Sequence, residues 1–267
     1  MCVVSQIHMS FPDFPFHVEG VVDVQPERTT VEQVLASLQL SGEEAAKIAH
    51  IPQGTHEWLN ARKYRITASN FGAAIGMNKY NTPRGLLKDL LWNTFRGNAA
   101  TKWGSDHEDV ARDAYVKYMQ DAISAGTSVY TSLRVEETGL HVNSSRPWLG
   151  SSPDGVVHVT TRDGGSHRFL LEIKCPYSRR FYNPPVPPHY KCQIQGMMAN
   201  MNLPYCDFVV WIPGSMQITR VQFDAPFWET TLLPGLHKFY HEMYLPRVVA
   251  KMNGELEEGE IDTVLHL

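Results

Sequence analysis

The sequence predicts an α/β (α+β) fold with a central mixed sheet flanked by helices, and three observations carry this prediction. Apolar runs at 156–159 and 169–175 are separated by a turn signal and predict an antiparallel hairpin. A second pair of strand-like runs follows at 206–212 and 216–223, joined at a Pro-Gly turn. Apolar residues at helical spacing mark other segments, such as 189–201. The chain has 267 residues and is 43% hydrophobic, which is enough for a full core.

Composition narrows the function classes. The net charge of -4 and a charged fraction of 19% exclude DNA binding by bulk positive charge, so any nucleic-acid contact must use a local basic patch together with a metal ion. The four cysteines show neither a CxxC motif nor zinc-ligand spacing, which predicts free thiols and a reducing compartment. No apolar run is long enough to span a membrane. We therefore expect a soluble, intracellular protein that lies in the cytoplasm or nucleus of a cell, which can be a virus-infected one.

Three parts of the chain are expected. At residues 1–50 we expect an N-terminal arm with short helices, whose simplest role is to pack against the main domain. Residues 51–253 predict the main domain, and 254–267 an acidic C-terminal tail that is most simply a solvated end. Helices are expected from Val31 to Leu40, from Gly42 to His50 and, to close the main domain, from Pro226 to Met252.

The segment that follows Thr55 predicts a helix, a turn and the start of another helix. Arg62 lies on the first helix, and Thr67 or Ser69 begins the second. Helix N-termini present free amide groups that favour phosphate, and hydroxyl groups beside Arg62 and Arg65 are suitable phosphate ligands. The alternative is an ordinary helix cap next to solvent-exposed arginines.

Two more helices are predicted downstream. Lys79 lies in the loop before a helix that begins at Pro83 and runs through Phe95. A helix from Asp106 carries Glu108 in its first turn, turned toward an apolar stripe that comprises Ala111, Ala114, Tyr115 and Tyr118. Glu108 is therefore either an acid stabilised by the helix dipole or a third acid for a metal site.

A strand pair at 129–135 and 139–142 is expected to lead into the first hairpin. Asp154 opens that hairpin, and Glu172 and Lys174 share one face of its second strand because side chains alternate. Two carboxylates and an ammonium in one small volume are costly without a ligand, whereas a magnesium ion removes the repulsion and leaves the lysine free to meet a phosphate. The alternative is a surface hairpin with an ordinary ion pair.

Pro153-Asp154 with Glu172-Ile173-Lys174 is the PD-(D/E)XK nuclease signature. Ser152-Pro153-Asp154-Gly155 and Glu172-Ile173-Lys174-Cys175-Pro176 are two of four separated pieces, and this ordered set resembles the lambda-exonuclease family, also called YqaJ-like viral recombinases, over roughly residues 55–225. The other two pieces are Arg62 with Ile66-Thr67-Ala68-Ser69 and Trp103-Gly104 with Glu108, and Tyr190 and Gln193 accompany the Glu172 piece. The resemblance implies a restriction-endonuclease-like PD-(D/E)XK core and an exonuclease that acts on duplex DNA from the 5′ end. The implied cofactor is Mg²⁺, which Mn²⁺ can replace.

Residue roles follow from the same resemblance. Asp154, Glu172 and the carbonyl group of Ile173 hold metal, Glu108 helps to hold a second metal, Lys174 serves the attacking water, and Gln193 lies beside them. The 5′-phosphate pocket comprises Arg62 and Ser69, with Thr67 and Lys79 as further candidates. Implied partners are double-stranded DNA with a free end, a single-strand annealing protein and two further copies of the chain in a ring. The acidic charge and the first fifty residues depart from the small phage enzymes.

Two other functions remain open at this point. One is a PD-(D/E)XK endonuclease in which Arg62 and Ser69 contact only the DNA backbone. The other is a non-catalytic DNA-binding recombination partner, against which the complete set of Asp154, Glu172 and Lys174 argues. Comparing linear with covalently closed circular duplex separates the first, and metal-dependent loss of DNA separates the second.

Overall fold

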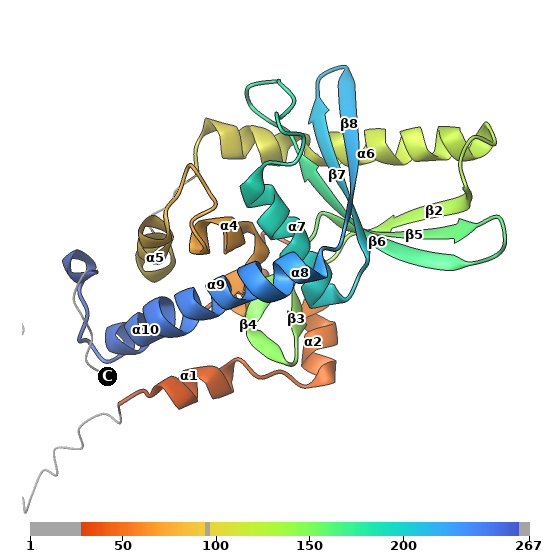
Figure 1. Ribbon diagram of the computed structural model, residues 1–267. Helices are drawn as coiled ribbons and strands as arrows, with labels where there is room; N and C mark the ends of the chain where they lie inside the picture. Colours follow the sequence, from red (N-terminus) through yellow and green to blue (C-terminus); the bar gives the residue numbers. More distant parts are fainter. Residues whose placement is uncertain (1–27, 94–96, 262–267) are drawn as a thin grey trace, which may run out of the picture.

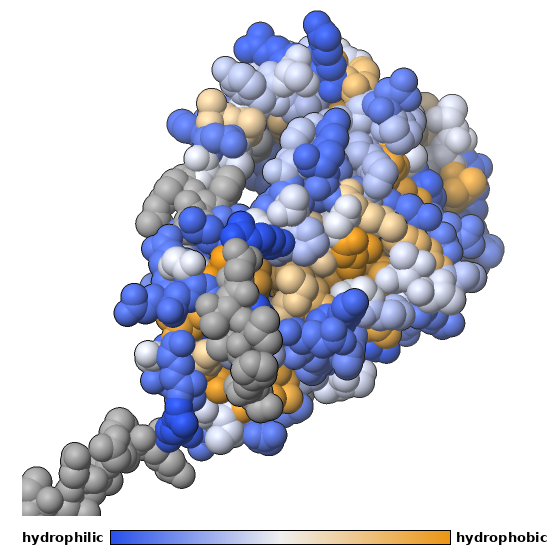
Figure 2. All heavy atoms as spheres, turned by 60° about the vertical axis from the view of Figure 1, so that its left-hand side comes forward, coloured by the Kyte–Doolittle hydropathy of each residue, from blue (hydrophilic) through white to orange (hydrophobic). Residues whose placement is uncertain are grey.

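The structure is a computed structural model that describes residues 28–93 and 97–261. The predicted irregular arm up to residue 25, the helix position Phe95 and residues 262–267 lie outside the described residues. Strands form two sheets, with the longest helix lying across the larger one (Figure 1). No helix in these ranges is both long and apolar enough to cross a membrane. Hydrophilic residues predominate on the face in Figure 2, where hydrophobic ones form smaller areas.

The larger sheet has the strand order β2-β5-β6-β7-β8. Its strands are β2 (Tyr130–Glu136), β5 (Gly155–Thr161), β6 (Ser166–Lys174), β7 (Tyr205–Ile212) and β8 (Ser215–Gln222). β5 and β6 are antiparallel with Gly155 opposite Leu171, whereas β6 and β7 are parallel with Glu172 opposite Phe208. Both predicted hairpins and the mixed sheet are therefore confirmed.

The smaller sheet has the order β1-β4-β3, with β1 at Ile66–Thr67, β3 at His141–Asn143 and β4 at Arg146–Ser151. The predicted pairing of 129–135 with 139–142 is wrong, because β2 pairs with β5 and β3 pairs with β4. Gly139 explains the separation. Its N–H donates a 2.7 Å hydrogen bond to the carbonyl of Ala49, and a Cβ there would lie 2.3 Å from the carbonyl oxygen of Ile51. The chain between β2 and β3 is thus held against the N-terminal helices.

Helices α6 (Ala99–Ser124) and α7 (Pro188–Met201) cover opposite faces of the larger sheet (Figure 1). Successive strand residues point to opposite faces, so Leu171 packs with Tyr115 of α6, whereas Leu170 packs with Ile194 of α7. Glu172 therefore shares the α7 face. Helix α6 begins seven residues before the predicted Asp106, where Asn98 accepts hydrogen bonds from the first-turn amides.

Two predicted details of the helix faces are wrong. Tyr118 was expected in the core stripe of α6 but is 57% exposed, because Val116 and Met119 continue the buried side of the helix instead. Gln195 was placed opposite the apolar face of α7 but is buried, and its amide donates a 2.9 Å hydrogen bond to the carbonyl of Gln222. Helix α7 packs against the sheet and also against α4 and the C-terminal helices, so it has buried residues on both sides.

The N-terminal helices are confirmed and pack on the main body. Capping boxes of Thr30 with Gln33 and of Ser41 with Glu44 start α1 (Val31–Ser37) and α2 (Gly42–Ala49). Helix α1 ends three residues before the predicted Leu40, and its Val34 enters the main core. Short elements then precede α6, namely α3 (His56–Ala61), a 3₁₀ turn η1 (Ala68–Asn70), α4 (Phe71–Ala74) and α5 (Pro83–Trp92).

The predicted closing helix is confirmed as a continuous helical run from Ala225 to Met252. It comprises α8 (Ala225–Phe227), η2 (Trp228–Leu232), α9 (Leu233–Lys238), η3 (Phe239–Tyr244) and α10 (Leu245–Met252). The segments η2 and η3 are π-helical, and each is followed by a Leu-Pro pair, at Pro234 and Pro246. Proline lacks the N–H that an α-helix uses, and the wider turn accommodates it.

The tail prediction is only partly right. Its described acidic side chains are exposed, but Leu256 and Ile261 are buried in the main core, and Arg247 donates a 3.1 Å hydrogen bond to the carbonyl of Ile261. Two apolar residues in an acidic segment are enough to attach it to the body.

Candidate active site

Three of the predicted site residues meet where β5 begins and β6 ends. Asp154 immediately precedes β5, while Glu172 and Lys174 lie at the end of β6 on its α7 face. The N–H of Ile173 donates a 2.6 Å hydrogen bond to Asp154 Oδ2, which ties the loop before β5 to the end of β6. The Lys174 ammonium donates a hydrogen bond to Glu172 Oε1. The hairpin thus places two carboxylates and one ammonium side by side.

Glu172 is the most enclosed member of this cluster. It is 1% exposed, and its Oε1 also accepts a 2.6 Å hydrogen bond from Nε2 of Gln193 on α7. Its Oε2 is buried and has no hydrogen-bond partner among the described residues. An unpaired buried carboxylate oxygen is costly, so this atom needs a cation or a water molecule.

The pKa values of the cluster show how crowded its negative charge is. Burial and then Asp154 raise the pKa of Glu172 to about 8. Burial also raises the pKa of Asp154. Burial alone would lower the pKa of Lys174, but the carboxylates of Glu172 and Asp154 outweigh it and raise that pKa. A single ammonium therefore faces two carboxylates, and further positive charge would stabilise the ionised cluster.

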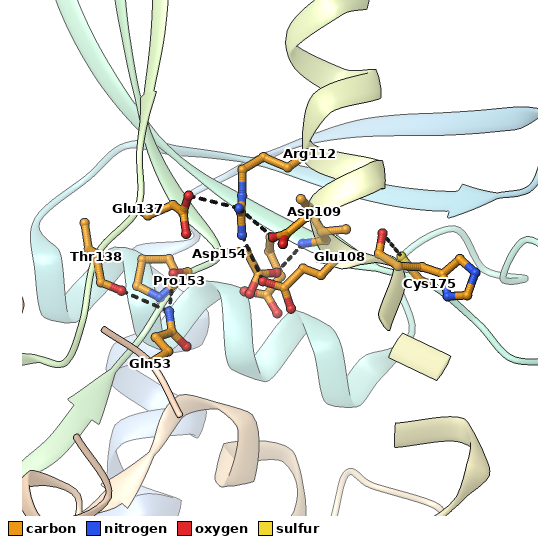
Figure 3. Close-up of polar contacts among 12 residues, drawn as sticks. Gln53, Glu108, Asp109, Arg112, Glu137, Thr138, Pro153, Asp154 and Cys175 are labelled. Atoms are coloured by element: carbon orange, nitrogen blue, oxygen red, sulfur yellow. Dashed lines mark hydrogen bonds and ion pairs between the residues drawn. The ribbon is translucent and has the colours of Figure 1, made fainter. Parts of the chain in front are cut away.

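Helix α6 brings Glu108 to the same cluster. Burial and then repulsion from Asp154 raise the pKa of Glu108 to about 7. Arg112, one turn further along, lies 3.1 Å from Glu108, 3.0 Å from Asp109 and 3.1 Å from Glu137 (Figure 3). The sequence interpretation missed Arg112, although its i, i+4 spacing from Glu108 is a signal that could have found it.

The residues present fit a divalent cation. Hard cations take oxygen ligands, and the unpaired Oε2 of Glu172 is such an atom. Across residues 28–93 and 97–261, no three His, Cys, Asp or Glu side chains already converge as a ligand set. Asp154 and Glu172 are the carboxylates of this cluster that could bind such an ion.

The second predicted group lies on α3 and the turn after it. The Arg62 guanidinium stacks 4.0 Å from the Trp58 ring centre and donates a 3.0 Å hydrogen bond to Thr67 Oγ1. Burial lowers the pKa of Arg62 to about 10, so it remains a cation at neutral pH. Thr67 is buried and stands at the N-cap position of η1, but its hydroxyl accepts no hydrogen bond from the η1 amides. Ser69 lies within η1 and is exposed. Trp58 Nε1 donates a 3.1 Å hydrogen bond to Ser152, two residues before Asp154.

Arg65 does not join this group, contrary to the sequence interpretation. It is 6% exposed and donates hydrogen bonds of 2.8 Å, 2.7 Å and 2.8 Å to the carbonyls of Pro147, Ala61 and Leu38. The sequence could not show that three chain segments place main-chain carbonyl groups around the Arg65 guanidinium. Lys79 is exposed in its loop, with its ammonium 4.9 Å from the Tyr80 ring centre.

Close packing of α4 on α7 sets these two groups relative to each other. A Cβ at Gly196 of α7 would lie 2.3 Å from the Phe71 ring, and a Cβ at Gly72 of α4 would lie 2.8 Å from His189. Only glycine allows the helices to approach so closely. The loop before β5 is held as well, because Gln53 Nε2 donates hydrogen bonds of 2.9 Å to the carbonyl of Pro153 and 3.0 Å to that of Thr138 (Figure 3).

Comparison with known proteins agrees with this fold. A solved alkaline exonuclease from Laribacter hongkongensis matches with a TM-score of 0.57 and 26% identity, over 75% of this chain and 97% of that chain. The same enzyme in complex with dAMP matches with a TM-score of 0.57 and 25% identity, with the same coverage. The fold is thus that of PD-(D/E)XK-type exonucleases, as predicted.

Residues 57–202 match the family model of the YqaJ-like viral recombinase domain, which is more than half of the chain. The chain belongs to this family, and the predicted resemblance is confirmed. An uncharacterized protein of Acanthamoeba polyphaga mimivirus is 26% identical over 209 residues, which are 72% of this chain and 34% of that protein. The chain therefore spans about a third of the length of this curated relative.

Proposed function

We propose that this protein is a metal-dependent 5′-to-3′ exonuclease that degrades one strand of linear double-stranded DNA to 5′-mononucleotides. The observation that carries the proposal is the buried Oε2 of Glu172, which lies in the cluster with Asp154 and Lys174 and has no hydrogen-bond partner in residues 28–93 and 97–261. A buried acid cluster of this kind destabilises the fold. A bound cation would offset that cost, and a metal-dependent nuclease requires such a cation.

The side chains divide the work of phosphodiester hydrolysis. Asp154, Glu172 and the Ile173 carbonyl would hold a divalent cation, and Glu108 would help to hold a second one. Bound there, Mg²⁺ or Mn²⁺ would supply a water of lowered pKa and neutralise charge on the scissile phosphate. Gln193 fixes Glu172 Oε1 through its 2.6 Å hydrogen bond, so the carboxylate keeps one orientation.

Lys174 has two candidate roles, which are to orient or deprotonate the attacking water and to neutralise charge on the phosphate. While it is protonated, the ammonium can only donate hydrogen bonds, which serves the electrostatic role, whereas the base role needs a lowered pKa. Its position beside Glu172 is compatible with either role.

Arg62 and Ser69 would hold the terminal 5′-phosphate, and Lys79 would add positive charge from its loop. A guanidinium can grip two phosphate oxygens, and the exposed hydroxyl of Ser69 is available for a third bond. Thr67 supports this pocket indirectly, since its hydroxyl accepts the hydrogen bond of Arg62. Holding the strand end would give the enzyme its direction.

The similar alkaline exonuclease supports the product assignment. It was solved with dAMP, a deoxynucleoside monophosphate, which is the kind of molecule that stepwise hydrolysis of DNA releases. The relation to a viral recombinase family supports a role in DNA recombination, repair or viral DNA processing.

The proposal is tested with Mg²⁺ on a linear duplex in which one strand carries a labelled 5′-phosphate and the other strand carries a 5′-hydroxyl. We expect labelled mononucleotide to appear first, the complementary strand to survive, and chelation to stop the reaction. Covalently closed circular duplex is the control and should remain intact. Cutting of the circle at a similar rate would establish an endonuclease, and no metal-dependent loss of DNA would leave a binding protein.

Partners are proposed on the family resemblance. A ring of three subunits would thread DNA and make digestion processive, and a single-strand annealing protein would receive the surviving strand. Light scattering should then give about 90 kDa, three times the chain mass of 30.2 kDa. A mass near 30.2 kDa at micromolar concentration would exclude a stable ring.

A further inference from the structure

A cavity of about 210 Å³ lies between the C-terminal end of α7 and strands β3 and β5. Val156 of β5, which packs on the α7 face with Leu170, is part of its floor, and Met201 of α7 is part of its wall. None of Asp154, Glu172 and Lys174 lines it. The cavity is therefore separate from the cluster at the end of β6.

Three buried polar atoms around the cavity are available to a ligand. Thr138 Oγ1, His141 Nε2 and Asn200 Oδ1 are buried and have no hydrogen-bond partner among the described residues, and all three residues line the cavity. Thr138 is 9% exposed and Asn200 8%. Buried polar groups are normally hydrogen-bonded, so three unpaired ones around one space are unusual. One water takes about 30 Å³ of liquid volume, so the space exceeds a single bridging water.

The chemistry of these atoms is mixed. The Asn200 amide donates a 3.0 Å hydrogen bond to the carbonyl of His141, which leaves Oδ1 as an acceptor toward the cavity. Burial, with His50 nearby, lowers the pKa of His141 to about 4, so its ring is neutral at neutral pH. The hydroxyl of Thr138 can donate or accept. An occupant must therefore carry both donors and acceptors on its buried edge.

Positive charge lies at the rim. Arg168 of β6 is exposed and lines the cavity, and its guanidinium makes no ion pair or hydrogen bond within the part of the chain that the structure describes. By contrast, the acid of the rim is already engaged, because Glu136 lies 2.9 Å from His158 Nε2 and 3.1 Å from Arg134. The rim thus offers one free guanidinium and favours an anionic group.

These features select a ligand class. The apolar side chains of Met201 and Leu203 line this space together with the unpaired polar atoms of Thr138, His141 and Asn200. A flat ring with donors and acceptors on its edge would suit such a lining. An anionic group outside the ring would meet Arg168. The volume is below the roughly 300–1,000 Å³ of sites that enclose a whole drug-sized ligand, so only the ring would be enclosed. A nucleobase that carries a phosphate has this shape and charge.

We propose that this cavity is a binding site for a free nucleoside 5′-monophosphate, with the base against Thr138, His141 and Asn200 and the phosphate at Arg168. The proposal does not depend on nuclease activity, because it uses none of the residues of the acid cluster.

The test is calorimetric titration of the full chain carrying Arg62→Ala with dAMP in the presence of a chelator, so that neither a divalent cation at Glu172 nor the candidate 5′-phosphate pocket holds a phosphate. We expect binding of one dAMP per chain, and weaker binding of deoxyadenosine and of inorganic phosphate, since each supplies half of the contacts. Thr138→Val keeps the shape and removes the hydroxyl, and Arg168→Ala removes the exposed cation; each should weaken dAMP binding at least about tenfold, or about 1.4 kcal/mol.

Lys117→Ala is the matched control, because it removes an exposed cation on α6, across the sheet, and should leave dAMP affinity unchanged. Absence of dAMP binding in chelator would overturn the proposal, as would binding that survives both cavity variants. A short single-stranded oligonucleotide is titrated in parallel. Cavity variants that weaken only the oligonucleotide would reassign the cavity to DNA and also overturn the proposal. The proposed nuclease activity can fail without affecting any of these outcomes.

Discussion

The indole of Trp58 joins the two groups of the candidate site, since its Nε1 donates a 3.1 Å hydrogen bond to Ser152 Oγ while Arg62 stacks 4.0 Å above its ring. Ser152 lies two residues before Asp154, so one side chain connects the candidate 5′-end pocket with the acid cluster. A disturbance of either group is therefore expected to reach the other through α3.

The first prediction concerns the strand end. Arg62→Ala should lose most of the preference for a 5′-phosphorylated over a 5′-hydroxyl end while it keeps residual metal-dependent cleavage. Charge-assisted hydrogen bonds contribute about 1.5–3 kcal/mol each, which corresponds to about ten- to hundredfold in rate. Rates are measured for both ends at one salt concentration. The neighbouring exposed Lys63, changed to Ala, is the control. Equal slowing of both ends in Arg62→Ala would make Arg62 a general backbone contact.

The second prediction concerns the acid cluster. Asp154→Ala and Lys174→Ala should each lower hydrolysis by about 10²–10³-fold or more, because each removes a group that acts on the reacting phosphate or its cation. Both side chains lie on the polar side of the hairpin end, so neither change opens a cavity in the core. Circular dichroism should show a native fold for both variants. Near wild-type turnover in either would refute the assignment of the site.

The third prediction is a pH dependence of stability. The folded pKa values of Glu172 and Glu108, about 8 and about 7, lie above the ordinary 4.5. The folded protein thus binds protons that the unfolded chain has lost, so this stability is full below about pH 4.5 and is lost as pH rises toward 8. In chelator, the melting temperature should fall between about pH 5 and pH 8. Millimolar Mg²⁺ should reduce the fall.

Glu172→Gln provides the control for this pH effect. The amide does not titrate, so the variant should show a shallower loss of melting temperature with pH and less stabilisation by Mg²⁺. A wild-type melting temperature that rises through the same pH window, or does not respond to Mg²⁺, would contradict both the crowding of the acids and the fit to a cation.

The fourth prediction concerns a buried network that the sequence did not reveal. Asp207 of β7 is 1% exposed and accepts hydrogen bonds of 2.8 Å from Arg220 Nε, 3.0 Å from Arg220 Nη2 and 2.8 Å from the hydroxyl of Tyr115. Arg220→Ala should cost about 3–5 kcal/mol in the free energy of unfolding, because it leaves a buried carboxylate unpaired. Replacing Asp207 as well, by Asn, should recover part of that loss in urea denaturation. A single-variant cost below about 1 kcal/mol would show that the pair is solvated.

The fifth prediction compares two glycines in helices. Gly196→Ala should destabilise the protein by about 1–3 kcal/mol, since its Cβ would lie 2.3 Å from the Phe71 ring. Gly104→Ala in α6 is the control, because a Cβ there meets nothing within 4 Å and should stabilise by up to about 1 kcal/mol. Denaturation midpoints of the two variants should therefore shift in opposite directions. Equal shifts would mean that α7 can move away from α4.

Local patterns predicted what local physics determines. Alternation on β6 placed Glu172 and Lys174 on one face, and the turn at 162–165 specified the partner strand, so the acid cluster followed from sequence. The 3.6-residue period placed Glu108 toward the same body. These elements succeed because their neighbours in space are also close in the chain or fixed by a regular period.

The predictions that were wrong concern residues whose neighbours in space are far away in the chain. Arg65 looked like a phosphate ligand because nothing near it in sequence shows the carbonyl of Leu38, 27 residues away, or that of Pro147, 82 residues away. The strand at 139–142 was paired wrongly because its true position depends on contact between Gly139 and the N-terminal helices. The link from Trp58 to Ser152 spans 94 residues. Contacts of this kind depend on tertiary packing, which periodicity does not encode.

Residues 136–138 connect the acid cluster with the cavity under α7. Glu136 and Thr138 line the cavity, while Glu137 between them turns the other way and pairs with Arg112. Because alternate positions serve opposite sides, loss or gain of a single residue here would exchange the two sides and misplace all three side chains at once. A substitution at one of these positions should therefore affect either the cavity or the Arg112 ion pair, but not both. An insertion or deletion in residues 136–138 should disturb both and abolish function.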